Sequence, residues 1–195
     1  NNLVKSGLKR INIIHKLISK IKTKTNIIAT TGFTSRELME VEKGRISLMN
    51  NNFYMVGGMG HSAALSLGIS LNNKKETICF DGDGSLLMHL GAMATIGFFG
   101  KKNFKHVLFN NNAHESVGGQ TTNAKKVDFE KLTKSLGYKK YFLISKRSDV
   151  LKKISSFLKA KGPVFLEILI EQGSIKNLMR PNDLKSIKIK FMKKI

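Results

Sequence analysis

The sequence is poor in acidic residues and cysteine and has no long apolar run. Its 195 residues include no tryptophan, one cysteine, and 13 Asp and Glu against 34 Lys and Arg. No run of 18 or more apolar residues occurs, so we predict no transmembrane helix. Cys79 lies in an apolar strand pattern, which indicates a buried thiol in a reducing compartment. Because the opening stretch also lacks the apolar core of a secretory signal, we expect a cytoplasmic protein.

The formal net charge of +21 raises the question of a nucleic-acid partner, because a basic surface attracts phosphate backbones. The lysines are scattered, however, arginine is scarce, and no aromatic-rich basic strand or DNA-binding pattern occurs. These features argue against nucleic acid, which stays open as the alternative from a different functional class. A positive surface would equally attract a small polyanionic substrate.

The chain is 41% hydrophobic and long enough to bury one core. Residues 1–24 are expected to form an amphipathic N-terminal helix with a basic outer face, its apolar stripe including Val4, Leu8, Ile11 and Ile18. Residues 25–195 are expected to form one domain. Six apolar strands are predicted at 26–30, 52–56, 74–81, 105–110, 139–144 and 164–170, alternating with helices. The alternation predicts an α/β fold with an open, mostly parallel six-stranded sheet and helices on both faces.

The stretch from Ile78 to Asn112 carries the strongest functional signal in the sequence. One apolar strand ends in the acidic, glycine-flanked turn 81–85, and the next apolar strand ends in the carboxamides 110–112. Both strand ends would lie on the same edge of a parallel sheet, where one carboxylate and one carboxamide could bind a hard cation. The pattern therefore predicts a Mg²⁺ site that holds a phosphorylated ligand.

Two neighbouring turns are also glycine- or hydroxyl-rich. Gly58-x-Gly60-x-x-Ala63 precedes a helix, and with Asp81 it passes for a dinucleotide-binding fingerprint, although Met59 occupies the turn. Thr34 or Ser35 is expected to cap a helix that begins at 36–38.

Taken together, Gly82-Asp83-Gly84-Ser85 and, after residues 86–109, Asn110-Asn111 resemble the two-part motif of thiamine-diphosphate enzymes. The turns 30–38 and 58–61 and the loop 110–120 are most similar to the phosphonopyruvate decarboxylases in that family. The resemblance runs from about Ile13 to the C-terminus and includes Arg180-Pro181. It covers the diphosphate-binding domain and implies that the pyrimidine-binding domain is absent from this chain.

The resemblance implies roles for individual residues. The implied cofactor-binding set is Thr31, Gly32, Thr34, Gly57, Gly58, Met59, Gly82, Asp83, Gly84, Ser85, Asn111, Ala113 and His114. Within that set Asp83, the Asn111 side chain and the Ala113 carbonyl would ligate Mg²⁺. His114 and Glu115 would be catalytic, and Asp81 would order the turn. Asn112 stands where relatives carry glycine, which is a mild departure if the position needs a positive φ.

The implied reaction is decarboxylation of phosphonopyruvate to phosphonoacetaldehyde and CO₂, with thiamine diphosphate accepting the released electrons. The glutamate that activates the cofactor would come from a pyrimidine-binding domain or subunit in a dimer or larger oligomer. Because the first residue is Asn, we expect either a separate subunit or the end of a longer polypeptide. A sulfopyruvate decarboxylase β-like subunit is the nearest alternative, and a degenerate, non-catalytic domain is a further one.

Overall fold

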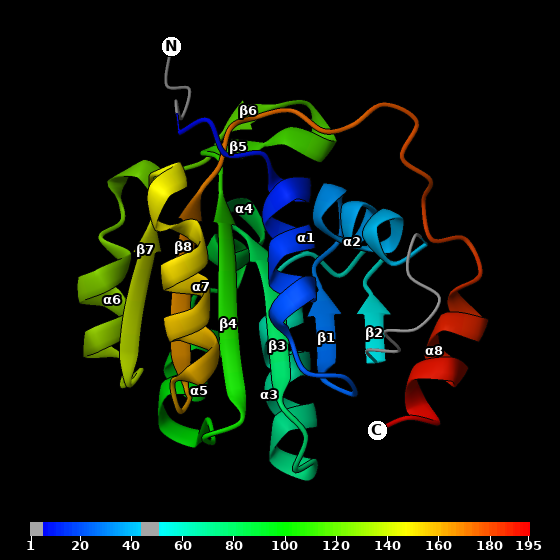
Figure 1. The fold of residues 1–195 in the computed structure, drawn as a ribbon, viewed down its shortest axis with the longest axis horizontal. Helices are drawn as coiled ribbons and strands as arrows, with labels where there is room; N and C mark the ends of the chain where they lie inside the picture. The colour runs from blue at the N-terminus through cyan, green and yellow to red at the C-terminus, as the bar shows by residue number, and fades with distance from the viewer. Residues whose placement is uncertain (1–5, 44–50) are drawn as a thin grey trace.

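The computed structural model describes residues 6–43 and 51–195, and its centre is a parallel sheet (Figure 1). The strand order is β2-β1-β3-β4-β8-β7, and all neighbouring pairs run parallel. The strands are β1 (Asn26–Ala29), β2 (Asn51–Tyr54), β3 (Thr77–Gly82), β4 (Phe104–Asn110), β7 (Lys140–Ile144) and β8 (Val164–Leu169). Near-continuous apolar runs are typical of parallel strands covered on both faces. The predicted six-stranded α/β sheet is confirmed.

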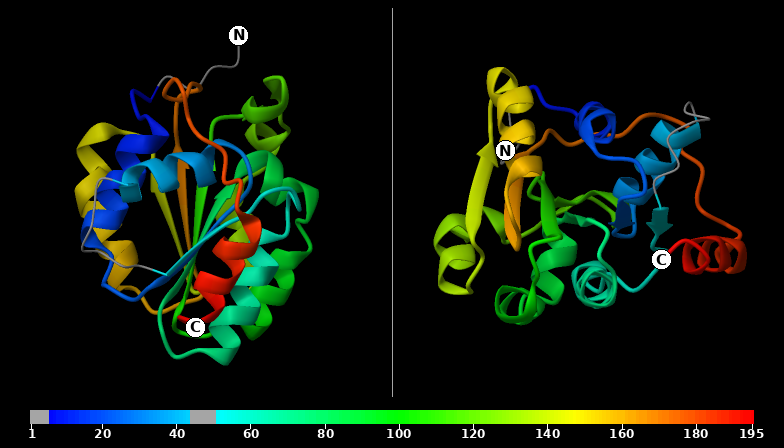
Figure 2. Two further views of the ribbon diagram at one scale, coloured as in Figure 1. Left: turned by 90° about the vertical axis from the view of Figure 1, so that its right-hand side faces the viewer. Right: turned by 60° about the horizontal axis from the view of Figure 1, so that its bottom comes forward.

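Helices cover both faces of this sheet. One core cluster joins the sheet to α1 (Arg10–Lys20), α2 (Phe33–Lys43) and α7 (Val150–Lys159). The other joins it to α3 (Ser62–Asn72), α4 (Asp83–Met88), α5 (Ala92–Phe99) and α6 (Phe129–Ser135). The last helix, α8 (Leu184–Met192), packs beside β2 at the sheet edge, as the views in Figure 2 show. In the described residues no helix has the length and apolar character needed to cross a membrane.

Three helix predictions need correction. Helix α1 begins at Arg10 rather than near residue 3, because Gly7 adopts a φ of +66° and donates its N–H to the Glu171 carboxylate. Val4 of the predicted stripe lies outside the described residues. Helix α2 begins at Phe33, so Thr34 and Ser35 lie inside its first turn and do not cap it.

The third correction concerns residues 85–97, whose apolar spacing in the sequence predicts one continuous helix after the acidic turn. They belong to two helices, α4 and α5, separated at His89–Gly91. The exposed His89 ring packs against His61 at a tilt of 48°, with 4.2 Å between the ring centroids. The break redirects the chain after the acidic turn and lets the short α4 end close to that turn.

The strand order creates a crevice at one edge of the sheet. From β1 the chain proceeds outward to β2, then crosses over to β3 on the other side of β1. Ligands of open α/β sheets bind at such switch points, outside the carboxyl ends of the strands. Here the ends of β1, β3 and β4 meet, and the loop after β4 forms a small hairpin of β5 (Ala113–His114) and β6 (Gln120–Thr121) above them.

Candidate active site

The ends of β3 and β4 bring the acidic turn and the carboxamides to one cavity. Gly82 pairs in register with Phe109, so the residues that follow the two strands emerge side by side. The cavity has a volume of about 50 Å³, and Asp83 and Asn111 both line it. The convergence of these two side chains, predicted from their places in the sequence, is therefore seen in the structure.

Asp83 is the first residue of α4 and is 2% exposed. Its carboxylate accepts a hydrogen bond from the Thr122 hydroxyl. Burial raises the pKa of the Asp83 carboxyl, and the bond from Thr122 and the nearby charge of His114 offset part of that rise. A buried carboxylate held this way gains from a cation, because a positive charge favours its ionised form.

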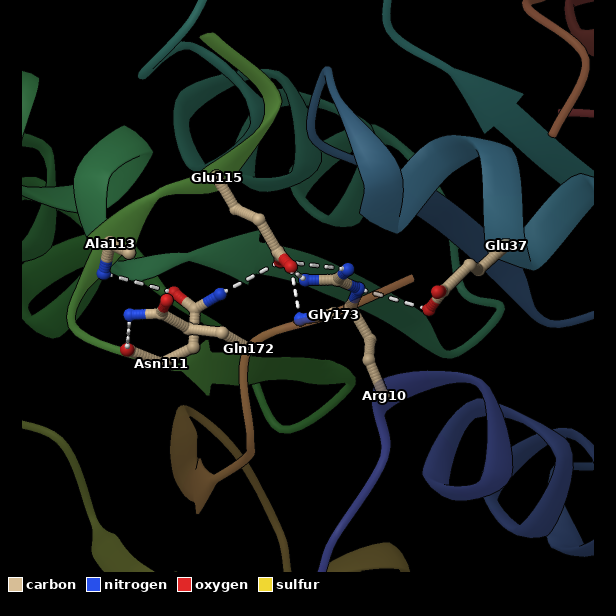
Figure 3. A network of polar contacts seen from close by, with 7 residues as sticks. All are labelled: Arg10, Glu37, Asn111, Ala113, Glu115, Gln172 and Gly173. Atoms are coloured by element: carbon tan, nitrogen blue, oxygen red, sulfur yellow. Dashed lines mark hydrogen bonds and ion pairs between the residues drawn. The ribbon is translucent and has the colours of Figure 1, made fainter. Parts of the chain in front are cut away.

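The Asn111 amide is held at both ends (Figure 3). Its Nδ2 donates to Glu115 Oε2 at 3.0 Å, and its Oδ1 accepts from the Ala113 N–H at 3.1 Å. Glu115 thus fixes which end of the amide is the oxygen. The oxygen lies on the same side as Ala113, the residue whose carbonyl was predicted as the third metal ligand.

Glu115 is itself held by three other groups. Arg10 of α1 donates to Glu115 Oε2 from Nη1 at 3.4 Å and Nη2 at 3.3 Å, and the Gly173 N–H donates to Oε1. Arg10 Nε also donates to Glu37 Oε2 of α2 at 3.0 Å, and both side chains of that pair are almost fully buried. Figure 3 shows this chain of contacts running from α2 through Arg10 to Asn111. We name the set Glu37, Arg10, Glu115 and Asn111 the closed corner of the site.

Burial raises the pKa of Glu37, although the Arg10 charge and hydrogen bond oppose that rise. Arg10 therefore pairs with two carboxylates at once, the buried Glu37 and the half-buried Glu115. The sequence predicts a helix with a basic outer face and does not single out Arg10, which is only 5% exposed and pairs inward.

The three asparagines after β4 have different surroundings. Asn110 donates from Nδ2 to Glu167 Oε1 at 2.7 Å and so points away from the cavity. Asn112 has a φ of +58°, which confirms the positive φ considered for this position. The side chain that reaches the cavity is Asn111.

Asp81 lies in the core below the turn. Its Oδ1 accepts from the Gly82 N–H at 2.9 Å, and its Oδ2 lies 3.3 Å from His106 Nε2. His106 Nδ1 in turn lies 3.1 Å from the Tyr138 hydroxyl. Asp81 therefore orders the turn, as predicted, and is not among the residues that line the cavity.

Close packing explains two of the glycines. A Cβ on Gly84 would lie 2.3 Å from His114 Nδ1, so only glycine lets the imidazole lie against this turn. A Cβ on Gly32 would lie 2.7 Å from Ser116 Oγ, which brings the loop after β5 against the turn after β1. The Ser85 hydroxyl accepts from the Gly60 N–H at 3.0 Å and lies 2.7 Å from Thr30 Oγ1, so it is engaged within the protein.

The structure gathers most of the predicted site residues around this cavity. Those that line it are Thr31, Thr34, Met59, Gly82, Asp83, Gly84, Ser85, Asn111, Ala113, His114 and Glu115. Gly32 and Gly57 line a neighbouring cavity instead, and Gly58 lines neither. The cavity is also lined by five residues that were not predicted from the sequence: Arg10, Thr30, Phe33, Phe109 and Ser116. Ser116 and Thr30 stood inside the quoted motifs and could have been included, whereas Arg10 had no signal.

The cavity fits a hard cation bound by oxygen. A buried carboxylate, an oriented amide oxygen and a backbone carbonyl are ligands of the kind that Mg²⁺ accepts. Glycine and hydroxyl residues also line the cavity, and such residues can donate hydrogen bonds to an anionic group beside the cation.

Comparison with known proteins agrees with this geometry. Residues 30–168 match the family described as thiamine pyrophosphate enzyme, C-terminal TPP binding domain. The phosphonopyruvate decarboxylase of Streptomyces viridochromogenes is 33% identical over 172 residues, covering 88% of this chain and 42% of that protein. The chain thus spans less than half the length of that relative.

Two relatives carry the name sulfopyruvate decarboxylase subunit beta. The Methanocaldococcus jannaschii protein is 38% identical over 130 residues, or 66% of each chain. The Methanothermobacter thermautotrophicus protein is 29% identical over 188 residues, or 96% of each chain. Because the family match spans most of the sheet and both parts of the motif, this chain belongs to the thiamine pyrophosphate enzymes and carries their C-terminal, cofactor-binding domain.

Proposed function

We propose that this chain forms the diphosphate- and metal-binding half of a thiamine-diphosphate-dependent decarboxylase whose substrate is a small anionic 2-oxo acid. The observation that carries the proposal is the meeting of the buried Asp83 and Asn111 side chains in one cavity at the ends of β3 and β4. The names of the relatives support the reaction class. Phosphonopyruvate is our first choice of substrate.

In this proposal Asp83, Asn111 and the Ala113 carbonyl bind Mg²⁺. The turn 82–85 and the hydroxyls of Thr31 and Thr34 face the diphosphate. The raised pKa of Asp83 supports the metal role, because a divalent cation would compensate the buried carboxylate. Met59 lines both this cavity and the neighbouring one, and in this proposal it would support the cofactor rings.

When bound, thiamine diphosphate accepts the electron pair that is released as the carboxylate leaves as CO₂. The chain must then supply a proton to the carbon that lost CO₂. His114 lines the cavity and lies against Gly84, so we assign it that proton transfer. Glu115 has both carboxylate oxygens engaged by Arg10, Asn111 and Gly173, and these contacts favour a positioning role over an acid–base role.

The chain needs a partner in this proposal, namely the pyrimidine-binding domain or subunit that supplies the activating glutamate. Helix α3 carries no charged residue, and in α4 and α5 the one charged residue is the buried Asp83. Large apolar side chains are nonetheless exposed there: Leu65, Met88, Phe98 and Phe99. An uncharged face with exposed aromatic residues, in a chain of charge +21, is typical of an interface core. We therefore expect a dimer or larger oligomer.

Sulfopyruvate is the second candidate substrate. The length of the chain favours this substrate. The alignment with the sulfopyruvate decarboxylase β subunit of Methanothermobacter thermautotrophicus covers 96% of each of the two chains. Decarboxylation assays with both 2-oxo acids, using the chain purified with its pyrimidine-binding partner, would decide between them. A higher kcat/KM with sulfopyruvate would replace our first choice.

The metal assignment is tested by Asp83→Ala in the same assembled enzyme. Calorimetry should detect thiamine diphosphate binding that requires Mg²⁺ in the wild type and no such binding in the variant. Asp149→Ala is the control, because Asp149 is a half-buried carboxylate just before α7 that pairs with Lys153 and does not line the cavity. Unchanged cofactor affinity in Asp83→Ala would refute the proposed metal site.

A further inference from the structure

A second cavity of about 230 Å³ adjoins the proposed active site. The two cavities share Thr31, Met59 and Ser116 as lining residues, so they are neighbours along one wall. Two arginines line the second cavity, Arg36 and Arg180. Neither arginine lines the proposed metal and diphosphate site, and both lie in segments whose sequences resemble the family.

The two arginines come from segments far apart in sequence. Arg36 lies in the first turn of α2, directly after the turn that follows β1. Arg180 lies in the long connection from β8 to α8, which crosses over the end of the sheet in Figure 1. Pro181 beside it is buried, so this part of the connection is held against the domain. The fold has thus brought two guanidinium groups to one cavity.

Arg36 is half-buried and Arg180 is exposed, and in the part of the chain that the structure describes neither has an acidic partner. Within residues 6–43 and 51–195, no carboxylate lies within 4.0 Å of either guanidinium group. The pKa of Arg36 is lowered by its partial burial and, secondly, by the positive charge of Arg180. A pair of like charges left without a counterion at a cavity would gain from an anion bound between them.

The remaining walls strengthen such an interaction. Apolar side chains line much of the cavity, namely Met55, Val56, Met59, Val117 and Pro181. Apolar walls beside the guanidinium groups offer few competing hydrogen-bond partners, so an anion in the cavity would bind chiefly to the two arginines. Guanidinium is also the side-chain group best shaped to bind a phosphonate or sulfonate through two parallel hydrogen bonds.

We infer that Arg36 and Arg180 bind the terminal anionic group of the 2-oxo acid substrate, at the end away from the carboxylate that leaves. The inference rests on the proposed function, and it adds the residues that select a phosphonate or sulfonate. Two uncompensated positive charges match a phosphonate dianion more fully than a sulfonate monoanion. This match of charge favours phosphonopyruvate over sulfopyruvate as the substrate.

The test uses Arg36→Gln and Arg180→Gln in the chain purified with its pyrimidine-binding partner. Turnover is measured with phosphonopyruvate, sulfopyruvate and pyruvate, which lacks the terminal anion. Each variant should lower the ratio of kcat/KM for phosphonopyruvate to that for pyruvate by about 10- to 100-fold, the value of one charged hydrogen bond. The fall with sulfopyruvate should be smaller. Lys176→Gln is the matched control, since it removes one exposed positive charge from the same connection but not from the cavity.

A binding measurement separates this inference from the proposed function. Methylphosphonate is titrated calorimetrically into the same assembled wild type and variants, without turnover. Binding to the wild type that weakens at least 10-fold in Arg36→Gln and Arg180→Gln supports the anion site, even if no 2-oxo acid is decarboxylated. Equal losses with pyruvate and phosphonopyruvate would overturn it. Loss of assembly with the partner in sedimentation experiments would also overturn it, because the arginines would then meet an acidic surface of the partner.

Discussion

Arginine side chains in two parts of the same site have opposite surroundings. In the closed corner, Arg10 is buried and binds two carboxylates, Glu37 and Glu115. In the open corner, which we define as Arg36 and Arg180 with their cavity, no carboxylate lies within ion-pair distance among the described residues. The Phe33 ring separates the corners, with the Cζ of Arg10 at 5.7 Å and that of Arg36 at 5.4 Å from its centroid.

The difference indicates that the arginines have two different roles, one in holding the site's structure and one in binding a ligand. Arg10, which is buried and paired with two carboxylates, holds the loop that carries Asn111, and Glu115 in turn sets the direction of the Asn111 amide. The main contribution of Arg10 to ligand binding is to keep that geometry fixed before the ligand arrives. An unpaired arginine at a cavity keeps its hydrogen-bond donors available for a ligand. The four experiments below test this division, from the largest expected effect to the smallest.

Replacing Arg10 with alanine should have the largest effect. The substitution leaves Glu37 and Glu115 without their shared counterion, and breaking a buried ion pair costs about 3–5 kcal/mol of unfolding free energy. Urea denaturation of the purified chain measures the loss. Lys9→Ala is the control, because Lys9 is exposed at the preceding position. A loss below about 1 kcal/mol, the range of exposed pairs, would mean that the closed corner does not depend on Arg10.

Replacing Glu115 with alanine should weaken metal binding. The Asn111 amide loses the acceptor that fixes its orientation, and loss of such a supporting contact lowers metal affinity about 10- to 100-fold. Calorimetry with Mg²⁺ and thiamine diphosphate on the assembled enzyme tests this, with the exposed Glu130→Ala as control. If kcat fell while cofactor affinity stayed at the wild-type value, Glu115 would act in the chemistry, as the sequence analysis predicted.

The pH dependence of stability should report on Glu37. Burial raises the pKa of its carboxyl above 4.5 in the folded chain, so the folded state binds its proton more tightly than the unfolded state does. That contribution to stability is present below pH 4.5 and is lost as the pH rises through the raised pKa, by at most about 1.4 kcal/mol per pH unit. Glu37→Gln removes the titration. The stability of the wild type relative to this variant should therefore fall with rising pH, and a constant difference would contradict the prediction.

Arg36→Gln and Arg180→Gln should change stability least. Neither removes an ion pair seen in the structure, and each relieves the repulsion between the two guanidinium groups. We expect unfolding free energies within about 1 kcal/mol of the wild type, in the range of ordinary surface substitutions. Urea denaturation of both variants and of Arg10→Ala, under the same conditions, compares their losses of unfolding free energy. If either variant lost several kcal/mol of unfolding free energy, its arginine would stabilise the fold as Arg10 does, and the two corners would no longer differ in this respect.

Much of the fold follows from local patterns. Apolar runs such as those of β3, β4 and β8 are buried on both faces, so the sheet class could be predicted without any knowledge of contacts. The positive φ of Asn112 was also foreseeable from its residue type. Helix ends were predicted less well. Thr34 and Ser35 looked like caps, yet α2 begins before them because its start is set by packing beneath the loop that carries Ser116.

By itself, the sequence determined the α/β class, the acidic and carboxamide turns at two strand ends, and the likeness to thiamine-diphosphate enzymes. These features depend on residues that are neighbours in the chain or on the order of the strands. Only the tertiary structure decided which charges are paired. Arg10 lies 27 residues from Glu37 and 105 from Glu115, and nothing local distinguishes it from Arg36. The energy of a charge depends on its burial and on its neighbours in space, and packing alone sets both.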